Sequence, residues 1–191
     1  SSTAAIYGDK QAGLIAESSP LDPCSPYGKS KAIIEMVLDD YRKTSLLSSV
    51  SLRYFNAAGA DVDGVLGERH SPETHLIPIL CEVASGERGV FDLFGCDYDT
   101  EDGTCVRDFV HVQDLCDAHL KSLAYLLSGH QGGSFNLGSE YGFSVKEVVS
   151  AMEIITGSQI PVMYRDRREG DPSVLVADSS RARAELSWNP K

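Results

Sequence analysis

The sequence predicts an α/β protein built around a parallel sheet, because two patterns alternate along the chain. Short apolar runs typical of buried strands are followed by segments in which apolar residues recur at helical spacing. The composition favours a folded protein that stays in water, since 42% of the 191 residues are hydrophobic and 24% are charged. The length allows one large domain or two small ones, and no run reaches the ~18 apolar residues that a membrane span needs.

The first predicted elements lie in the opening third of the chain. Residues 1–7 have the pattern of a buried strand end, and a loop rich in Asp, Ser and Pro follows. Ser25 is a candidate helix N-cap with Pro26 at the first helical position, so a helix is predicted to run as far as Thr44. A second buried strand is predicted over 50–55.

The rest of the chain continues the alternation. An S-x-x-E capping box from Ser144 to Glu147 predicts a helix start, and Gly157 predicts the end of that helix. The turn-prone segments 56–73 and 97–103 are predicted as loops. In chain order, the other predicted elements are a helix over 76–85, a strand over 91–94, a helix that follows 110–112 and reaches 126, a strand over 135–137 and a helix over 179–186.

The net charge excludes several classes of partner. The chain has 17 Lys+Arg against 28 Asp+Glu, a formal charge of −11, and this field repels nucleic-acid backbones and anionic membranes. We therefore expect neither a nucleic acid nor a membrane as partner. A small anionic ligand needs locally gathered positive charge, and the candidates are Arg107 and the pair Arg167-Arg168.

The cysteine pattern bears on the compartment and on metals. Cys24, Cys81, Cys96, Cys105 and Cys116 are odd in number and include no C-x-x-C pair, which fits neither a disulfide framework nor a zinc site. We predict a reducing, cytoplasmic location and no metal. Because the sequence lacks a starting Met and opens in an apolar stretch, we expect a fragment of a longer protein.

A tyrosine and a lysine at the start of the first helix are the main candidates for chemistry. Tyr27 and Lys31 are four residues apart and therefore share one helix face. A neighbouring cation favours the phenolate form of a tyrosine, which makes it a usable acid/base catalyst. In the alternative, Tyr27 only packs and Lys31 is solvated. Thr3 and the segment 53–56 end two predicted strands at the sheet edge where α/β sites form.

Five segments, in order along the whole chain, carry a specific resemblance. They are Ser1-Ser2-Thr3-Ala4-Ala5-Ile6-Tyr7-Gly8, Ser25-Pro26-Tyr27-Gly28-Lys29-Ser30-Lys31, Leu52-Arg53-Tyr54-Phe55-Asn56, Asp102-Gly103-Thr104-Cys105-Val106-Arg107-Asp108 and Arg167-Arg168-Glu169-Gly170-Asp171. With these motifs the sequence resembles the extended short-chain dehydrogenase/reductase family and, within it, the UDP-glucose 4-epimerases.

The resemblance implies a fold and a reaction. The fold is the C-terminal part of a Rossmann-type parallel sheet with a smaller mixed α/β substrate-binding lobe. Residues 1–61 would belong to the NAD-binding domain and 62–191 mainly to the UDP-sugar lobe, with about 108–138 returning to the first. The implied reaction is reversible epimerisation at sugar C4 of UDP-glucose and UDP-galactose, through a 4-keto intermediate with tightly bound NAD. A homodimer is implied for the complete protein.

The resemblance also implies roles for single residues. Tyr27 would be the base, Lys31 would hold the nicotinamide ribose, and Thr3 would hydrogen-bond the reacting sugar oxygen. The implied NAD-binding set is Thr3, Tyr27, Lys31, Tyr54 and Phe55. The implied substrate-binding set is Asn56, His75, Leu76, Phe94, Arg107, Arg168, Asp171 and Leu175, with both arginines on the pyrophosphate, Asp171 near the uridine ribose and Leu175 beside the sugar C2 substituent.

Structural roles remain as alternatives for several of these residues. The two arginines would then pair with Asp108 and Glu169 at the surface, where exposed charges usually contribute little. His75 would cap or pack at a helix start, and Leu175 would be a core residue in an apolar, strand-like run.

The family's glycine-rich dinucleotide fingerprint is absent from this sequence, so we expect the fragment alone to be inactive. Rival functions are another UDP-sugar short-chain enzyme, such as a pentose or N-acetylhexosamine 4-epimerase or a dehydratase, and a catalytically silent sugar-nucleotide-binding module. Dehydratases of the family need a carboxylate directly after the Ser/Thr. Ala4 and Ala5 follow Thr3 here, which favours epimerisation.

Overall fold

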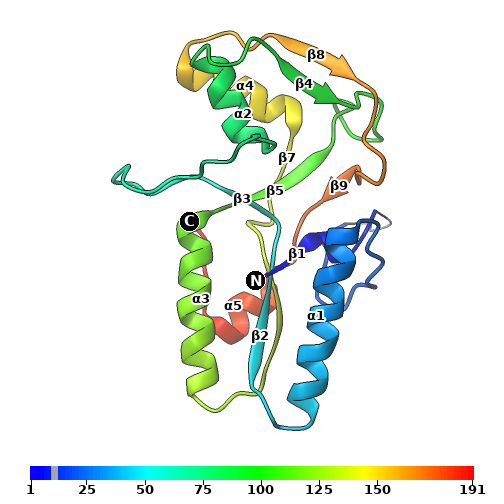
Figure 1. Ribbon diagram of the computed structural model, residues 1–191, viewed down its shortest axis with the longest axis vertical. Helices are drawn as coiled ribbons and strands as arrows, with labels where there is room; N and C mark the ends of the chain where they lie inside the picture. The colour runs from blue at the N-terminus through cyan, green and yellow to red at the C-terminus, as the bar shows by residue number, and fades with distance from the viewer. Residues whose placement is uncertain (10–12) are drawn as a thin grey trace.

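The computed structural model describes residues 1–9 and 13–191, and its lower part is a parallel three-stranded sheet in the order β1-β2-β6 (Figure 1). The strands are β1 (Ser2–Thr3), β2 (Ser49–Tyr54) and β6 (Gly132–Leu137). Both strand pairs are parallel, with Ser2 opposite Arg53 and Leu52 opposite Phe135. The predicted α/β fold with a parallel sheet is therefore confirmed.

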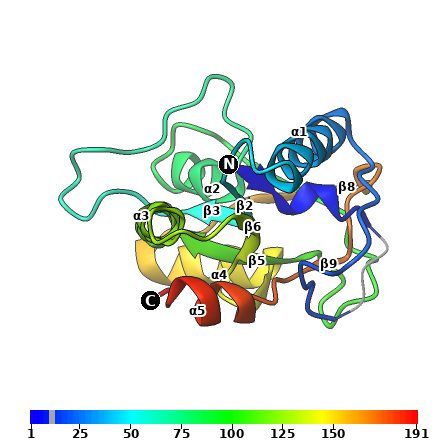
Figure 2. The same cartoon turned by 90° about the horizontal axis from the view of Figure 1, so that it is seen from below.

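Helices cover both faces of this sheet (Figure 2). On one face lies α1 (Pro26–Lys43), beside β1. On the other face α3 (Val112–Leu127) and α5 (Ser180–Leu186) pack around a core that includes Phe135 and Trp188. Burying apolar side chains on both faces is what a parallel sheet requires.

The first strand is shorter than predicted. β1 stops at Thr3, and the chain continues as a 3-10 helix, η1 (Ala4–Ile6). The Thr3 hydroxyl accepts a hydrogen bond from the Ala5 backbone N–H at 3.2 Å, which caps η1 and offers the backbone an alternative to strand pairing. Ala4 and Ile6 are buried all the same. The apolar run therefore indicated burial correctly and strand conformation wrongly.

A second sheet joins the lower body to an upper lobe. Its central strand β5 (Val106–His111) is parallel to β3 (Asn56–Ala58) and β9 (Val174–Leu175), and antiparallel to β7 (Gly142–Ser144). The sequence did not predict β5 as a strand, because two charged residues interrupt its apolar run. β3 begins inside the predicted loop 56–73 and is only three residues long.

The upper lobe has its own core. It contains α2 (Leu76–Ala84), α4 (Val145–Thr156) and the parallel pair β4 (Phe91–Phe94) and β8 (Val162–Arg165). Leu80, Leu93 and Ile160 are buried between them. α4 begins with the predicted capping box and ends at Gly157 in the left-handed conformation, at a φ of 67°. The strand β8 was not predicted, since most of its side chains are exposed.

Two further observations concern the chain as a whole. No helix in the described residues is long and apolar enough to cross a membrane. The division into an NAD-binding part and a substrate lobe remains a prediction, but α5 and Trp188 add to the lower body a segment that lies beyond 108–138.

Candidate active site

The carboxyl end of β1 and the start of α1 meet at one point of the structure. Gly28, in the first turn of α1, packs so closely on η1 that an added Cβ would lie 2.5 Å from the Ala5 carbonyl oxygen. Ser25 caps the helix by accepting a hydrogen bond from the Gly28 backbone N–H at 3.0 Å, and Pro26 is its first residue, as predicted. The glycine therefore brings the helix start next to the strand end that carries Thr3.

Tyr27 and Lys31 lie on one exposed face of this helix start. The Tyr27 side chain is accessible, with the residue 56% exposed, and the Lys31 ammonium lies 5.8 Å from the centroid of its ring. Lys31 Nζ also donates to the Ser1 carbonyl oxygen at 3.1 Å, which places it near the first strand. A phenol and an ammonium thus lie together at the carboxyl edge of the sheet, on the helix start that packs against the residues after Thr3, where they can exchange a proton with a bound molecule.

A cavity of about 200 Å³ lies beside this edge and extends into the second sheet. Three predicted substrate residues line it, Arg107, Asp171 and Leu175. The remaining lining residues come from the strand end, the loop before α1 and the segment before β9: Ala4, Ala5, Gly8, Cys24, Ser25, Gly170 and Pro172. The structure therefore brings three predicted substrate residues together beside Ala4 and Ser25, which adjoin Thr3 and the start of α1, whereas Thr3, Tyr27 and Lys31 do not line the cavity.

Arg107 is a buried cation in this cavity. It is 8% exposed, and its guanidinium pairs with the carboxylate of Asp171 and donates to the Val106 carbonyl oxygen at 2.8 Å. The surface ion pair with Asp108 that the sequence allowed does not form. Asp108 is instead fully buried and accepts hydrogen bonds from the backbone N–H groups of Ser139 and Ala177 at 2.6 and 3.1 Å.

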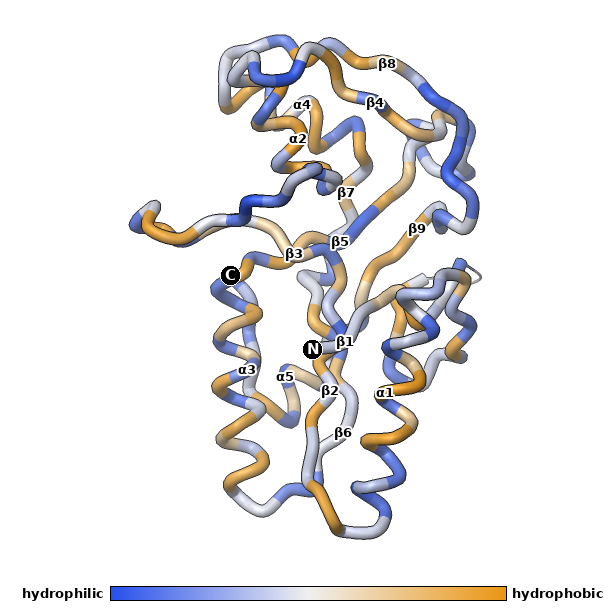
Figure 3. Tube along the Cα trace, in the orientation of Figure 1, coloured by the Kyte–Doolittle hydropathy of each residue, from blue (hydrophilic) through white to orange (hydrophobic). Residues whose placement is uncertain are grey.

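Arg168 belongs to the hydrophilic segment between β8 and β9 (Figure 3). Its guanidinium lies 4.0 Å from the centroid of the Phe94 ring, so these two predicted substrate residues are in contact. Within the described residues Arg168 has no ion-pair partner, whereas the neighbouring Arg167 pairs with Asp97 at 2.6 Å. A stacked cation without a carboxylate is available to an anionic ligand.

His75 and Leu76 lie at the start of α2 and do not line the cavity. His75 Nδ1 is 2.9 Å from carboxylate oxygens of both Glu68 and Glu73, and with His70 these side chains place four possible metal-ligand atoms within 4.8 Å of one another. Hydrogen bonds from the His75 backbone and ring hold the pKa of Glu73 below its usual range. The His75 ring and the two carboxylates satisfy one another without an ion. That the protein binds no metal remains a prediction.

The residues at the end of β2 diverge. The Tyr54 hydroxyl contacts the His119 ring of α3, on the face of the sheet opposite α1, and burial raises the pKa of Tyr54. Phe55 is buried in the core beside η1, and Asn56 begins β3 opposite Phe109. Phe55 thus lies near the candidate catalytic residues, while the predicted role of the Tyr54 side chain at the nicotinamide has no support from its position.

A set of buried polar residues near the site was not predicted from the sequence. Arg53, Glu35 and Asp108 are at most 8% exposed. Arg53 and Glu35 lie within segments that were identified by their apolar residues, and Asp108 lies in β5, which was not predicted as a strand. A charged residue in the middle of an apolar run was the available signal, because such a residue must be paired when it is buried. Burial raises the pKa of Asp108, although four groups donate hydrogen bonds to it.

Comparisons with known proteins agree with this architecture. A parallel sheet with a Tyr-Lys pair at its carboxyl edge, next to a lobe with arginines at a cavity, is typical of the extended short-chain dehydrogenase/reductase class. The chain belongs to the family described as GDP-mannose 4,6 dehydratase, whose family model matches residues 1–191.

Among curated proteins, the chain is 50% identical to the UDP-glucose 4-epimerase of Halalkalibacterium halodurans over 191 residues, which are 100% of this chain and 57% of that protein. A UDP-glucose 4-epimerase structure from Stenotrophomonas maltophila, with bound NAD and formylated UDP-arabinopyranose, is 38% identical with a TM-score of 0.96 and is covered to 57% by the whole chain. A UDP-Glc/GlcNAc 4-epimerase from Campylobacter jejuni is 48% identical with a TM-score of 0.78, again over the whole chain and 58% of that protein. The chain thus spans little more than half the length of these relatives.

Proposed function

We propose that the complete protein is an NAD-dependent UDP-sugar 4-epimerase that interconverts UDP-glucose and UDP-galactose. The observation that carries the proposal is the Tyr27-Lys31 pair on the helix start that packs against the end of β1, next to a cavity lined by Arg107 and Asp171. The names of the relatives support the same reaction.

The proton transfer is assigned to three side chains. The Tyr27 phenolate accepts the proton of the sugar 4-hydroxyl and returns it at the end of the cycle, while the Thr3 hydroxyl donates a hydrogen bond to the same oxygen. The Lys31 ammonium lies 5.8 Å from the centroid of the Tyr27 ring, on the same helix face. NAD, when bound, would supply the hydride chemistry at the sugar C4, while Tyr27 and Thr3 act on the 4-oxygen.

The residues present fit the nicotinamide end of NAD. The Tyr27 ring is accessible and the Lys31 ammonium projects from the same helix face, where it can donate hydrogen bonds to ribose hydroxyls. Phe55 borders this region from the buried side. These residues would hold the nicotinamide ribose.

Recognition of the UDP group is assigned to the two arginines. Arg107 presents a buried guanidinium to the cavity and Arg168 presents a stacked one at the segment before β9. Guanidinium groups bind phosphate oxygens through paired hydrogen bonds, and we assign Asp171, which pairs with Arg107, to a ribose hydroxyl. In a chain with a net charge of −11, this local pair supplies the positive charge that a diphosphate requires.

The family model carries the name of a dehydratase, so this alternative needs its own test. Elimination of water requires an additional acid/base group, and the two residues after Thr3, which line the cavity, are Ala4 and Ala5. We therefore favour epimerisation. A product 18 mass units lighter than the substrate, the mass of one water, would support the dehydratase instead.

Partner and compartment follow from other features. We propose a homodimer, because α1 exposes Ile33, Ile34, Val37 and Tyr41 along its outer face. We propose a cytoplasmic location, because the five cysteines are free and four of them are exposed. Light scattering on the complete protein tests the first proposal, and a fluorescent fusion at native expression tests the second.

The decisive experiment follows conversion of UDP-galactose to UDP-glucose by NMR in the complete protein. Replacing Tyr27 by Phe removes only the hydroxyl and is expected to lower kcat by about 10²–10⁴-fold, with unchanged NAD content. The control is Tyr141→Phe, because Tyr141 is an exposed tyrosine outside the candidate site and outside α1. UDP binding by calorimetry without any conversion would support the silent binding module, and a near-native rate of Tyr27→Phe would exclude Tyr27 as the base.

A further inference from the structure

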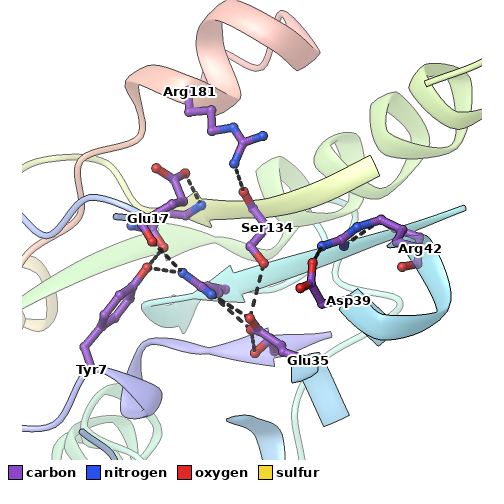
Figure 4. Close-up of polar contacts among 11 residues, drawn as sticks. Tyr7, Glu17, Glu35, Asp39, Arg42, Ser134 and Arg181 are labelled. Atoms are coloured by element: carbon purple, nitrogen blue, oxygen red, sulfur yellow. Dashed lines mark hydrogen bonds and ion pairs between the residues drawn. The ribbon is translucent and has the colours of Figure 1, made fainter. Parts of the chain in front are cut away.

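A buried ion pair joins α1 to the sheet below the candidate catalytic residues. Arg53 of β2 and Glu35 of α1 are 5% and 8% exposed. The Arg53 Nη2 atom lies 2.6 Å from Glu35 Oε2, and Arg53 Nε donates to both carboxylate oxygens at 3.1 Å. Figure 4 shows Glu35 at the centre of these contacts. The pair is bidentate, so it fixes the orientation of both side chains as well as their separation.

Further hydrogen bonds extend the pair into a network (Figure 4). The Ser2 hydroxyl donates to Glu35 Oε1, and the Ser134 hydroxyl donates to Glu35 Oε2 at 3.2 Å. Arg53 Nη1 donates to the Tyr7 hydroxyl at 2.7 Å, and that hydroxyl donates to the Asn136 side-chain oxygen at 2.7 Å. Every strand of the lower sheet therefore contributes at least one member.

The network members occupy special positions in the sequence. Ser2 directly precedes Thr3, Arg53 lies opposite Ser2 in the strand register, and Glu35 lies one helical turn beyond Lys31. Ser2 and Arg53 are opposite each other in parallel register, and their hydrogen bonds to Glu35 show that both side chains point toward α1. A shift of Glu35 would therefore move the helix that carries Lys31 relative to the strand that carries Thr3.

The physical cost of burying charges argues that this pair has a role besides stability. The free energy of hydration that two ions lose on burial is seldom exceeded by the free energy of their attraction. Apolar residues of similar volume would therefore hold α1 on the sheet at least as firmly. Apolar packing, however, leaves more freedom in the sliding and rotation of a helix than a bidentate ion pair does.

We propose that Glu35 and Arg53, with Ser2, form a positioning network that sets the register of Lys31 and Tyr27 over Thr3. The proposal rests on the proposed function of Tyr27. Glu35 touches no reacting atom. It acts through α1 and, by the Ser2 hydrogen bond, through β1, so disturbing the Ser2 contact is expected to impair turnover more than substrate binding.

Two serines allow a matched test, because both donate to Glu35 but only one adjoins a catalytic residue. Ser2→Ala in the complete protein is expected to lower kcat roughly 10-fold or more, since displacements approaching 1 Å cost up to about 100-fold, with KM for the UDP-sugar unchanged. Ser134→Ala removes the equivalent hydrogen bond on β6, which carries no catalytic candidate, and should leave both constants unchanged. Ser2→Thr restores the hydroxyl and should recover kcat.

Hydrogen exchange gives a second measurement that needs no turnover. Ser2→Ala should speed amide exchange in residues 2–6 and at the start of α1, whereas Ser134→Ala should not. Equal kcat values for the two alanine variants, or losses in Ser2→Ala that Ser2→Thr fails to restore, would overturn the proposal. If Tyr27→Phe keeps its activity, the proposed function fails instead, and the exchange data still decide whether Ser2 fixes these segments.

Discussion

The close approach of Gly28 to η1 supports a quantitative prediction. In Gly28→Ala the new Cβ would lie 2.5 Å from the Ala5 carbonyl oxygen and 3.1 Å from both the Ala5 carbonyl carbon and Pro23 Cβ. An ordinary carbon–oxygen contact is about 3.3 Å or more, so the helix start must move away by roughly 0.8 Å. The obstacle is backbone, which cannot rotate aside as a side chain would.

Two effects of this substitution oppose each other. Alanine favours a helix over glycine by about 1 kcal/mol at an interior position and by less in the first turn. Overpacking costs about 1–3 kcal/mol, so we expect a net loss of about 1–2 kcal/mol in the free energy of unfolding. Because Tyr27 adjoins Gly28, the same movement should lower kcat by roughly 10- to 100-fold.

Urea denaturation and initial rates on the complete protein measure both quantities. Gly89→Ala is the control, because a Cβ at Gly89 meets no atom within 4 Å, and its stability should stay within about 0.5 kcal/mol of the parent. If Gly28→Ala matched Gly89→Ala in stability and rate, the tight contact between α1 and η1 would be refuted.

Three further predictions concern the cavity and the C-terminal helix. Arg107→Ala should raise KM for the UDP-sugar about 10- to 100-fold, the equivalent of about 1.5–3 kcal/mol for a charged hydrogen bond. The control Arg165→Ala breaks a surface ion pair with Asp92 and should leave KM unchanged. Equal KM values for the two variants would indicate that Arg107 has a structural role. Leu175 lines the cavity and lies opposite Arg107 in the pairing of β9 with β5. Because a larger side chain would fill the pocket, Leu175→Tyr should suppress turnover of UDP-N-acetylglucosamine while UDP-glucose is tolerated. Equal losses in kcat/KM for the two sugars, or no activity of the parent on the N-acetyl sugar, would contradict this. Hydrogen bonds from the Ser180 hydroxyl and backbone N–H lower the pKa of Asp178, so its contribution to stability is complete above the usual pKa of about 3.9 and is lost as the pH falls through the lowered value. Asp178→Ala should therefore cost about 1 kcal/mol at pH 7 and nothing at strongly acidic pH. The fluorescence of Trp188, the single tryptophan in residues 1–191, follows unfolding, and a loss independent of pH would refute the assignment.

Local signals made much of the fold predictable. The start of α1 followed from Ser25 and Pro26, and both ends of α4 followed from a capping box and a glycine, because such signals depend on neighbouring residues only. β3 and β8 were missed because they are short strands with largely exposed or half-buried side chains, which leave no apolar alternation to detect.

The candidate site divides in the same way. Tyr27 and Lys31 were predictable together because helix geometry alone places residues four apart on one face. The pairing of Arg107 with Asp171, which are 64 residues apart, depends on the path of the chain between β8 and β9, and no local pattern encodes it. Glu35 was concealed because it lies among the apolar residues that identified α1.

Asp108 limits the substitutions that this position can accept during evolution. Its two carboxylate oxygens accept from three backbone N–H groups, of Ser139, Glu140 and Ala177, and from the Ser139 hydroxyl. Asparagine has nearly the same shape, yet its amide NH2 group is a hydrogen-bond donor. It would face backbone N–H groups, which are also donors and cannot accept a hydrogen bond. An exchange to asparagine therefore requires a change in the backbone of the 139–140 turn. A side-chain substitution alone cannot supply it, because it does not remove backbone N–H donors. Natural variation at the junction of the two sheets should accordingly accumulate around this aspartate and spare it.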